Sequence, residues 1–147
     1  MEADTNSLIN AVLQVAAVIG LVLLNGFFVA AEFALVSVRR TRIEELAGQG
    51  RAGAAAVRKA LEDPDKVIAA TQLGITIASL ALGWIGEPAL SRFIEPIIDT
   101  IPLPAQMANL TSHSISAAIG FSLITFLHVV VGELAPKSVA LQRPEAT

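Results

Sequence analysis

Three long apolar segments dominate the pattern of hydrophobic and polar positions in this chain. Residues 8–38 contain one charged side chain, Glu32, and residues 67–86 contain none. Residues 115–141 are also largely apolar, and His128 is the only ionisable group in their first eighteen positions. A helix of about 20 apolar residues crosses a hydrocarbon core of about 30 Å. The pattern therefore predicts an all-α integral membrane protein with three transmembrane helices in a single domain, residues 1–147.

Basic residues are distributed unequally between the two connections. Residues 87–114 hold only Arg92. By the positive-inside rule, the more basic connection is cytoplasmic. We therefore expect a multi-pass protein of the cell membrane, or inner membrane, with its N-terminus outside and its C-terminus in the cytoplasm. The connection at residues 39–66 carries seven of the ten Lys and Arg residues: Arg39, Arg40, Arg42, Arg51, Arg58, Lys59 and Lys66.

Both connections carry further helix signals. Thr41 and Glu44 have the spacing of a capping box, and residues 54–61 form a second short helical pattern. We expect two juxtamembrane helices within residues 41–63, lying along the cytoplasmic surface, with a solvated linker as the alternative. In the outer connection, apolar spacing predicts a short amphipathic helix around residues 89–98.

Composition excludes several classes of function. Of the 147 residues, 54% are hydrophobic and 16% charged, and the net charge is −3, which argues against nucleic acid as a partner. The absence of cysteine excludes disulfides and thiolate metal sites. The chain lacks the HExxH and GxSxG motifs of common hydrolases. We do not expect an enzyme.

Polar side chains inside the apolar segments are the candidate functional residues. Glu32 and Glu133 would each cost about 2.5–3.5 kcal/mol to insert. Helical rise places Glu32, Gln72 and Glu133 about 6–15 Å from the cytoplasmic boundary, in one layer. Asn25 shares a face with Glu32. Carboxylate and amide oxygens are hard ligands that suit Mg²⁺, Ca²⁺ or Na⁺.

Smaller groups extend this candidate site. Gln72, Thr76 and Ser79 follow the helical repeat of the second segment, near Gly74. In the third segment, Ser122, Thr125 and Glu133 form a stripe. Pro136 lacks an N–H and so releases the carbonyl of Gly132 as a further oxygen ligand. The candidate cation ligands are Glu133, Asn25, Gly74, Gln72, Thr76, Ser79, Gly132 and Glu32.

Each of these residues also has a structural interpretation. Serine and threonine hydroxyls often bond back to their own helix. Asn25 and Gln72 are the types of side chain that hydrogen-bond between membrane helices, and small residues such as Gly74 allow close helix contact. Glu32 has Arg39 seven residues away, and Glu133 has Lys137 at the i+4 position of a helical ion pair. His128 has the setting of a packed or hydrogen-bonded histidine.

Three motifs resemble the transmembrane domain of the CorC/CNNM family. They are NGFFVAAEFAL at residues 25–35, TQLGIT at 71–76 and GELAPK at 132–137, and they occur in the family's order. The resemblance implies a homodimer with three transmembrane helices and juxtamembrane helices that exports Mg²⁺, with Na⁺ as the proposed coupling ion. It also implies downstream cytoplasmic CBS modules, which bind ATP and which this chain lacks.

The same resemblance carries over to individual positions. Glu133 matches the family's third-span acid, and Asn25 stands where eukaryotic relatives have serine. Gly74 and Ser79 fall where those relatives have asparagines, whereas Glu32 has no acidic counterpart in them. We expect Mg²⁺ transport by alternating access, and the alternative is a membrane anchor or sensor for a regulatory module. Sequence does not fix the coupling ion, direction, full ligand set, divalent selectivity, or carrier as opposed to channel.

Overall fold

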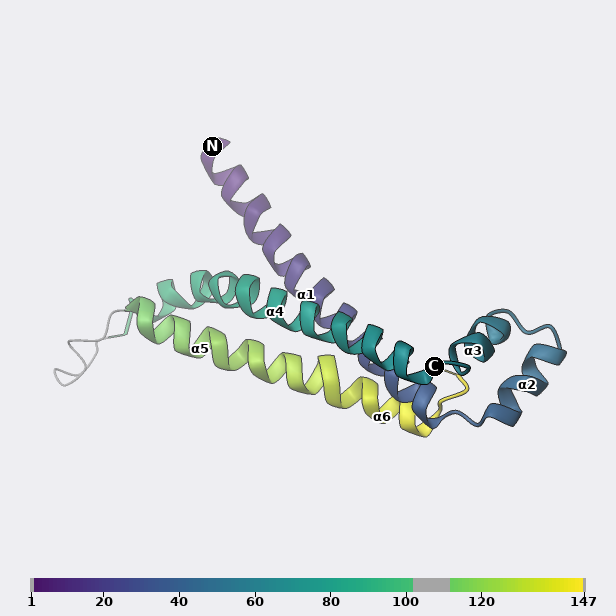
Figure 1. The fold of residues 1–147 in the computed structure, drawn as a ribbon. Coiled ribbons are helices and arrows are strands. Elements are labelled where there is room, and N and C mark those ends of the chain that lie inside the picture. Colours follow the sequence, from purple (N-terminus) through teal and green to yellow (C-terminus); the bar gives the residue numbers. More distant parts are fainter. Residues whose placement is uncertain (1, 102–111, 147) are drawn as a thin grey trace. The chain divides into compact units, whose positions relative to one another are not determined.

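The computed structural model describes residues 2–101 and 112–146, and these residues form helices without any β-strand (Figure 1). Three segments are long and apolar enough to cross a membrane: Ile9–Ser37, Pro64–Ile98 and His113–Gln142. The prediction of an all-α membrane protein with three spans is thereby confirmed. The helices are α1 (Glu2–Ser37), α2 (Arg40–Gly48), α3 (Ala54–Ala60), α4 (Pro64–Ile98), α5 (Ser112–Leu127), a π-helical segment (His128–Leu134) and α6 (Ala135–Gln142).

The second span continues further than the hydropathy pattern predicts. α4 is one helix of 35 residues, so the helix expected at 89–98 is a continuation of α4 and not a separate element. Pro88 and Pro96 lie inside it. Each proline removes one helical N–H, and the flanking hydrogen bonds continue the helix past it. The rest of the outer connection falls largely outside the described residues.

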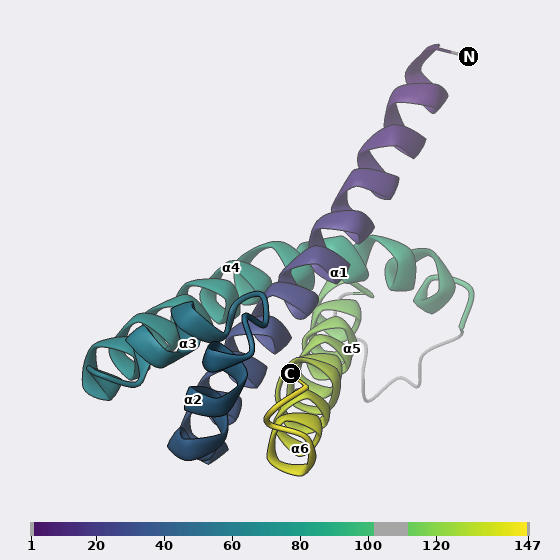
Figure 2. The same ribbon diagram turned by 90° about the vertical axis from the view of Figure 1, so that its right-hand side faces the viewer.

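The two juxtamembrane helices are present between the first and second spans, where α2 and α3 lie side by side (Figure 2). The N-cap of α2 is Arg39, without a side-chain cap hydrogen bond, so the capping box expected at Thr41 does not form. Gly50 and Gly53 have φ angles of 72° and 83°, which residues with a side chain rarely adopt. These two glycines make the turn between the two helices.

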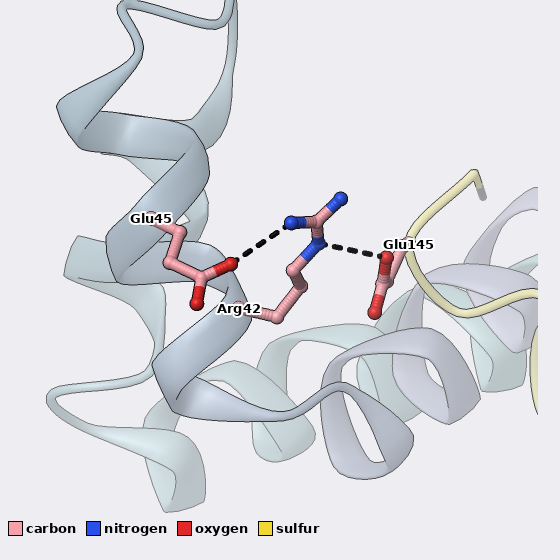
Figure 3. A network of polar contacts seen from close by, with 3 residues as sticks. All are labelled: Arg42, Glu45 and Glu145. Atoms are coloured by element: carbon pink, nitrogen blue, oxygen red, sulfur yellow. Dashed lines mark hydrogen bonds and ion pairs between the residues drawn. The ribbon is translucent and has the colours of Figure 1, made fainter.

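Arg42 connects α2 to the C-terminal segment. Its guanidinium donates to Glu45 Oε2 at 2.8 Å and to Glu145 Oε2 at 3.2 Å (Figure 3). Both hydrogen bonds raise the pKa of Arg42 above its ordinary value, and the bond to Glu45 has the larger effect. The guanidinium thus joins two segments that are distant in the sequence.

The described residues form two compact units. One contains the chain up to Val22 together with Ala78–Val129. The other contains Leu23–Ile77 and the chain from Val130 onward. In the first unit, α4 packs against α5 and the first half of α1. Its buried apolar cluster comprises Val18, Val22, Leu82, Ala89 and Ile124.

The second unit holds the three sequence motifs. The second half of α1 is hydrogen-bonded both to the start of α4 and to the segment after Val130. Many large apolar side chains of the spans remain exposed, such as Phe27 at 65% and Leu73 at 61%. Such exposure is expected of helices that face lipid, because lipid tails are as apolar as leucine.

Candidate cation site

Asn25 is a buried polar residue of the second unit. It is 1% exposed, and its amide Nδ2 donates to the carbonyl oxygen of Gly132 at 2.9 Å. The bond joins the first motif to the third across 107 positions of sequence. Asn25 therefore fixes the backbone that carries Glu133.

The carbonyl of Gly132 accepts this bond at an irregular part of the third span. Pro136 has no N–H, so the α-helical bond to Gly132 cannot form. The chain is π-helical from His128 to Leu134, an irregularity that often marks functional sites. The released carbonyl was predicted as a ligand, and the structure shows that the Asn25 amide already satisfies one of its lone pairs.

Gly26 allows the first and third motifs to approach closely. A Cβ at this position would lie 3.0 Å from Pro136 Cγ and 3.6 Å from the carbonyl oxygen of Val131. Contacts of 3.0 Å are tighter than most real Cβ contacts. The absence of a side chain at Gly26 therefore allows α1 to contact the backbone of the third span at Val131 and Gly132.

Glu32 contacts the second motif through Thr71 and not through Gln72. Thr71 is 8% exposed, and its hydroxyl lies 3.3 Å from Glu32 Oε2. The same hydroxyl is 2.9 Å from the carbonyl of Ile68 and 3.1 Å from that of Val67. A hydroxyl has one proton, so it donates to one of these acceptors at a time.

A small cavity of about 30 Å³ adjoins Glu32 and Thr71. Its other lining residues are apolar and come from α1, α3 and the start of α4. A cavity of this size can hold a water molecule, but it offers few oxygen ligands to a cation. Glu32 is therefore a partly buried carboxyl group that is hydrogen-bonded to Thr71, in surroundings with few oxygen ligands for a cation.

Gly74 lies beneath the ring of Phe28. A Cβ at Gly74 would fall 2.6–2.7 Å from three ring carbons of Phe28. The ring of Phe28 also packs edge-on against Phe27, with ring centroids 5.5 Å apart. Gly74 thus allows the second span to pack closely against the first, as expected of a small residue between membrane helices.

Glu133 is exposed on the surface of the single chain. Within the described part of the chain, its carboxylate makes neither an ion pair nor a hydrogen bond. Lys137, the alternative partner, places its Nζ 4.5 Å above the ring centre of Phe33. Glu32 likewise forms no ion pair with Arg39 there. Neither acid is thus neutralised by the basic residue nearest in sequence.

The remaining predicted ligands are divided between the two units, and those of the second unit, Gln72 and Thr76, make no hydrogen bond to Glu32 or Glu133 there. Gln72 and Thr76 are exposed, and the Thr76 hydroxyl donates to the Gln72 carbonyl at 2.8 Å. Ser122 and Thr125 bond back to their own helix in the same way, at 2.8 Å. Ser79 belongs to the first unit, where its Oγ lies 3.1 Å from Nε2 of His128.

Thr71 and Phe28 were missed as site residues by sequence reasoning. Both lie inside the quoted motifs, so the signal was present. Thr71 directly precedes Gln72, and depth along a helix does not separate neighbours that point about 100° apart. Among the described residues there is no cluster of three His, Cys, Asp or Glu, so a cation held here would need carbonyl, amide or water oxygens as well.

The Asn25 bond leads to a first prediction. We expect Asn25→Ala to lower the free energy of unfolding by about 1–3 kcal/mol, because the Gly132 carbonyl loses its buried donor. Thermal unfolding of the detergent-solubilised chain measures this loss. Asn10→Ala, at an exposed position of α1, is the matched control. Equal melting temperatures for the two variants would contradict the role of Asn25.

Comparison with known proteins gives a family match over almost the whole chain. The family model described as the cyclin M transmembrane N-terminal domain, CNNM, matches residues 16–147. UPF0053 protein YhdT of Bacillus subtilis is 49% identical over 125 residues, which cover 85% of this chain and 26% of that protein. UPF0053 protein YugS of the same organism is 42% identical over 135 residues, covering 92% and 30%. The chain thus spans between a quarter and a third of these relatives.

Proposed function

Because this chain belongs to the family of cyclin M transmembrane N-terminal domains, we propose that it is the membrane-embedded part of a Mg²⁺ transporter. One observation carries the proposal: Glu133 sits on a π-helical interruption of an apolar span, beside a carbonyl that a buried amide holds in place. Irregular backbone next to an acidic side chain is a device by which transporters bind cations. The chain performs no covalent chemistry in this proposal.

The chemistry of these groups favours Mg²⁺ as cargo. Mg²⁺ takes about six oxygen ligands at about 2.0–2.1 Å and retains several waters. Glu133 supplies negative charge, and the backbone near Gly132 supplies oxygen dipoles. Asn25, hydrogen-bonded to Gly132, acts chiefly by positioning this segment. Glu32, with its apolar surroundings, serves the fold and the charge balance of the site.

A single chain leaves this site incomplete. Glu133, Gln72 and Thr76 are exposed at positions that the hydropathy pattern places within the bilayer. Lipid tails cannot satisfy these polar groups, so protein or a water-filled cavity must cover them. A second copy of the chain supplies such a cover, and the proposal therefore includes a homodimer. CBS modules would follow in the full-length protein.

The proposed transport cycle is alternating access with the N-terminus outside and the C-terminus in the cytoplasm. The empty site carries uncompensated negative charge and therefore attracts Mg²⁺ from the cytoplasm. Rearrangement of the spans then exposes the ion outward, and Na⁺ or protons neutralise the carboxylates on return. The π-helical segment is suited to such a rearrangement because its backbone bonds are already irregular.

The test is Mg²⁺ flux in liposomes that contain the purified chain and a fluorescent Mg²⁺ indicator. We expect flux above that of protein-free liposomes, saturating with Mg²⁺ concentration and changing with an imposed Na⁺ gradient. A chain that dimerises but neither binds Mg²⁺ in calorimetry nor carries it would overturn the proposal. That outcome would favour the alternative function, a membrane anchor for a regulatory module.

A further inference from the structure

A second opening in the structure lies away from the candidate cation site. It is a groove of about 510 Å³ between the end of α1, the α2–α3 pair and the C-terminal segment. All of these elements belong to one unit. The volume is within the range of about 300–1,000 Å³ that small-molecule sites occupy. Its apolar wall includes Ala34, Leu35, Val38, Ile43, Leu46 and Val57.

This groove lies where the first span leaves the membrane. α1 ends at Ser37, and the basic residues that follow mark the cytoplasmic boundary. An apolar groove that is open to water exposes surface at a cost of about 25 cal/mol per Å². At the boundary of a bilayer, an acyl chain is the nearest apolar occupant.

The charge at the groove selects the headgroup. Arg51 lines the groove, and its guanidinium has no partner among the described residues. Glu145 also lines the groove, but Arg42 donates to its carboxylate (Figure 3). Arg42 is shared with Glu45, so the charge argument depends on the unpaired guanidinium of Arg51 and on the connection at residues 39–66, which holds seven basic and five acidic residues. This net positive charge matches the anionic lipids of the cytoplasmic leaflet.

We propose that this groove binds an anionic phospholipid, with an acyl chain along the apolar wall and the phosphate at Arg51. A guanidinium binds phosphate oxygens through paired N–H donors. The site is independent of the proposed transport, because it shares no residue with the candidate cation ligands. A bound lipid would pack α2 and α3 against the end of α1.

Native mass spectrometry of the detergent-solubilised chain tests the site. Phosphatidylglycerol and phosphatidylcholine are added at equal concentration, and the fraction of chain that retains each lipid is measured. We expect preferential retention of phosphatidylglycerol. Arg51→Gln should lower that retention about five-fold, the effect of one basic side chain near a phosphate. Arg58→Gln, an exposed position on α3 outside the groove, should leave retention unchanged.

A second variant tests the acyl chain. Ala31 lines the groove, and Ala31→Leu should narrow it and lower phosphatidylglycerol retention while Arg51 remains. Helix content by circular dichroism checks that each variant is folded. Equal retention of the two lipids would overturn the proposal. So would an equal loss in Arg51→Gln and Arg58→Gln, because that result indicates diffuse attraction to a basic surface.

Discussion

Glu133→Gln is expected to reduce Mg²⁺ flux by about ten-fold to a hundred-fold, the equivalent of about 1.5–3 kcal/mol for one charged ligand. Glutamine keeps the shape of the side chain and removes its charge, so the ion loses a Coulombic partner. Because Glu133 forms no ion pair among the described residues, its neutralisation leaves no basic group uncompensated. The fold should therefore be unchanged.

The measurement is the initial rate of indicator fluorescence in liposomes, compared at equal reconstituted protein. Glu62→Gln, an exposed acid in the connection between α3 and α4, is the control for a change in net charge. Unfolding temperatures of both variants should match that of the parent chain. Full flux in Glu133→Gln would remove this residue from the mechanism, even if the chain transports Mg²⁺.

The sequence predicted the fold well because bilayer thickness strongly constrains the length of an apolar helix. Three spans and two juxtamembrane helices could be placed from hydropathy and helix signals alone. The continuation of α4 to Ile98 could not be predicted in this way. Pro88 suggests that the helix ends there, but α4 continues through it. The sequence pattern also predicted an N-cap at Thr41, which is wrong because α2 already begins at Arg40.

Depth along a helix does not predict how each candidate site residue is rotated about its helix. The sequence predicts one layer for Glu32, Gln72 and Glu133, whereas the contact that Glu32 makes with the TQLGIT motif is with the hydroxyl of Thr71. Gln72, one position on, is turned to the surface. The release of the Gly132 carbonyl followed from Pro136, but its capture by Asn25 depends on how two helices pack. Such packing is a tertiary property that a single helix pattern does not contain.

A larger loss of stability is expected from Gly74→Ala than from alanine at either of the other glycines of α4, Gly83 and Gly86. The added Cβ would lie 2.6 Å from Phe28 Cε1, well inside contact distance. The ring must move, but it also packs against Phe27, so the strain reaches the first motif. Overpacking of this kind costs about 1–3 kcal/mol. The measurement is thermal unfolding in detergent, followed by circular dichroism.

Two companion variants separate a clash from a change in helix propensity. Gly83→Ala lies on the same helix with nothing within 4 Å of its Cβ, and it should be neutral or slightly stabilising because alanine favours helix. Phe28→Leu in the Gly74→Ala background should recover part of the lost stability, because it removes the ring that the new Cβ meets. Without this recovery, or with Gly74→Ala as stable as Gly83→Ala, the Phe28 contact would not be what requires glycine. With recovery, glycine in TQLGIT is explained by packing, without any role as a ligand.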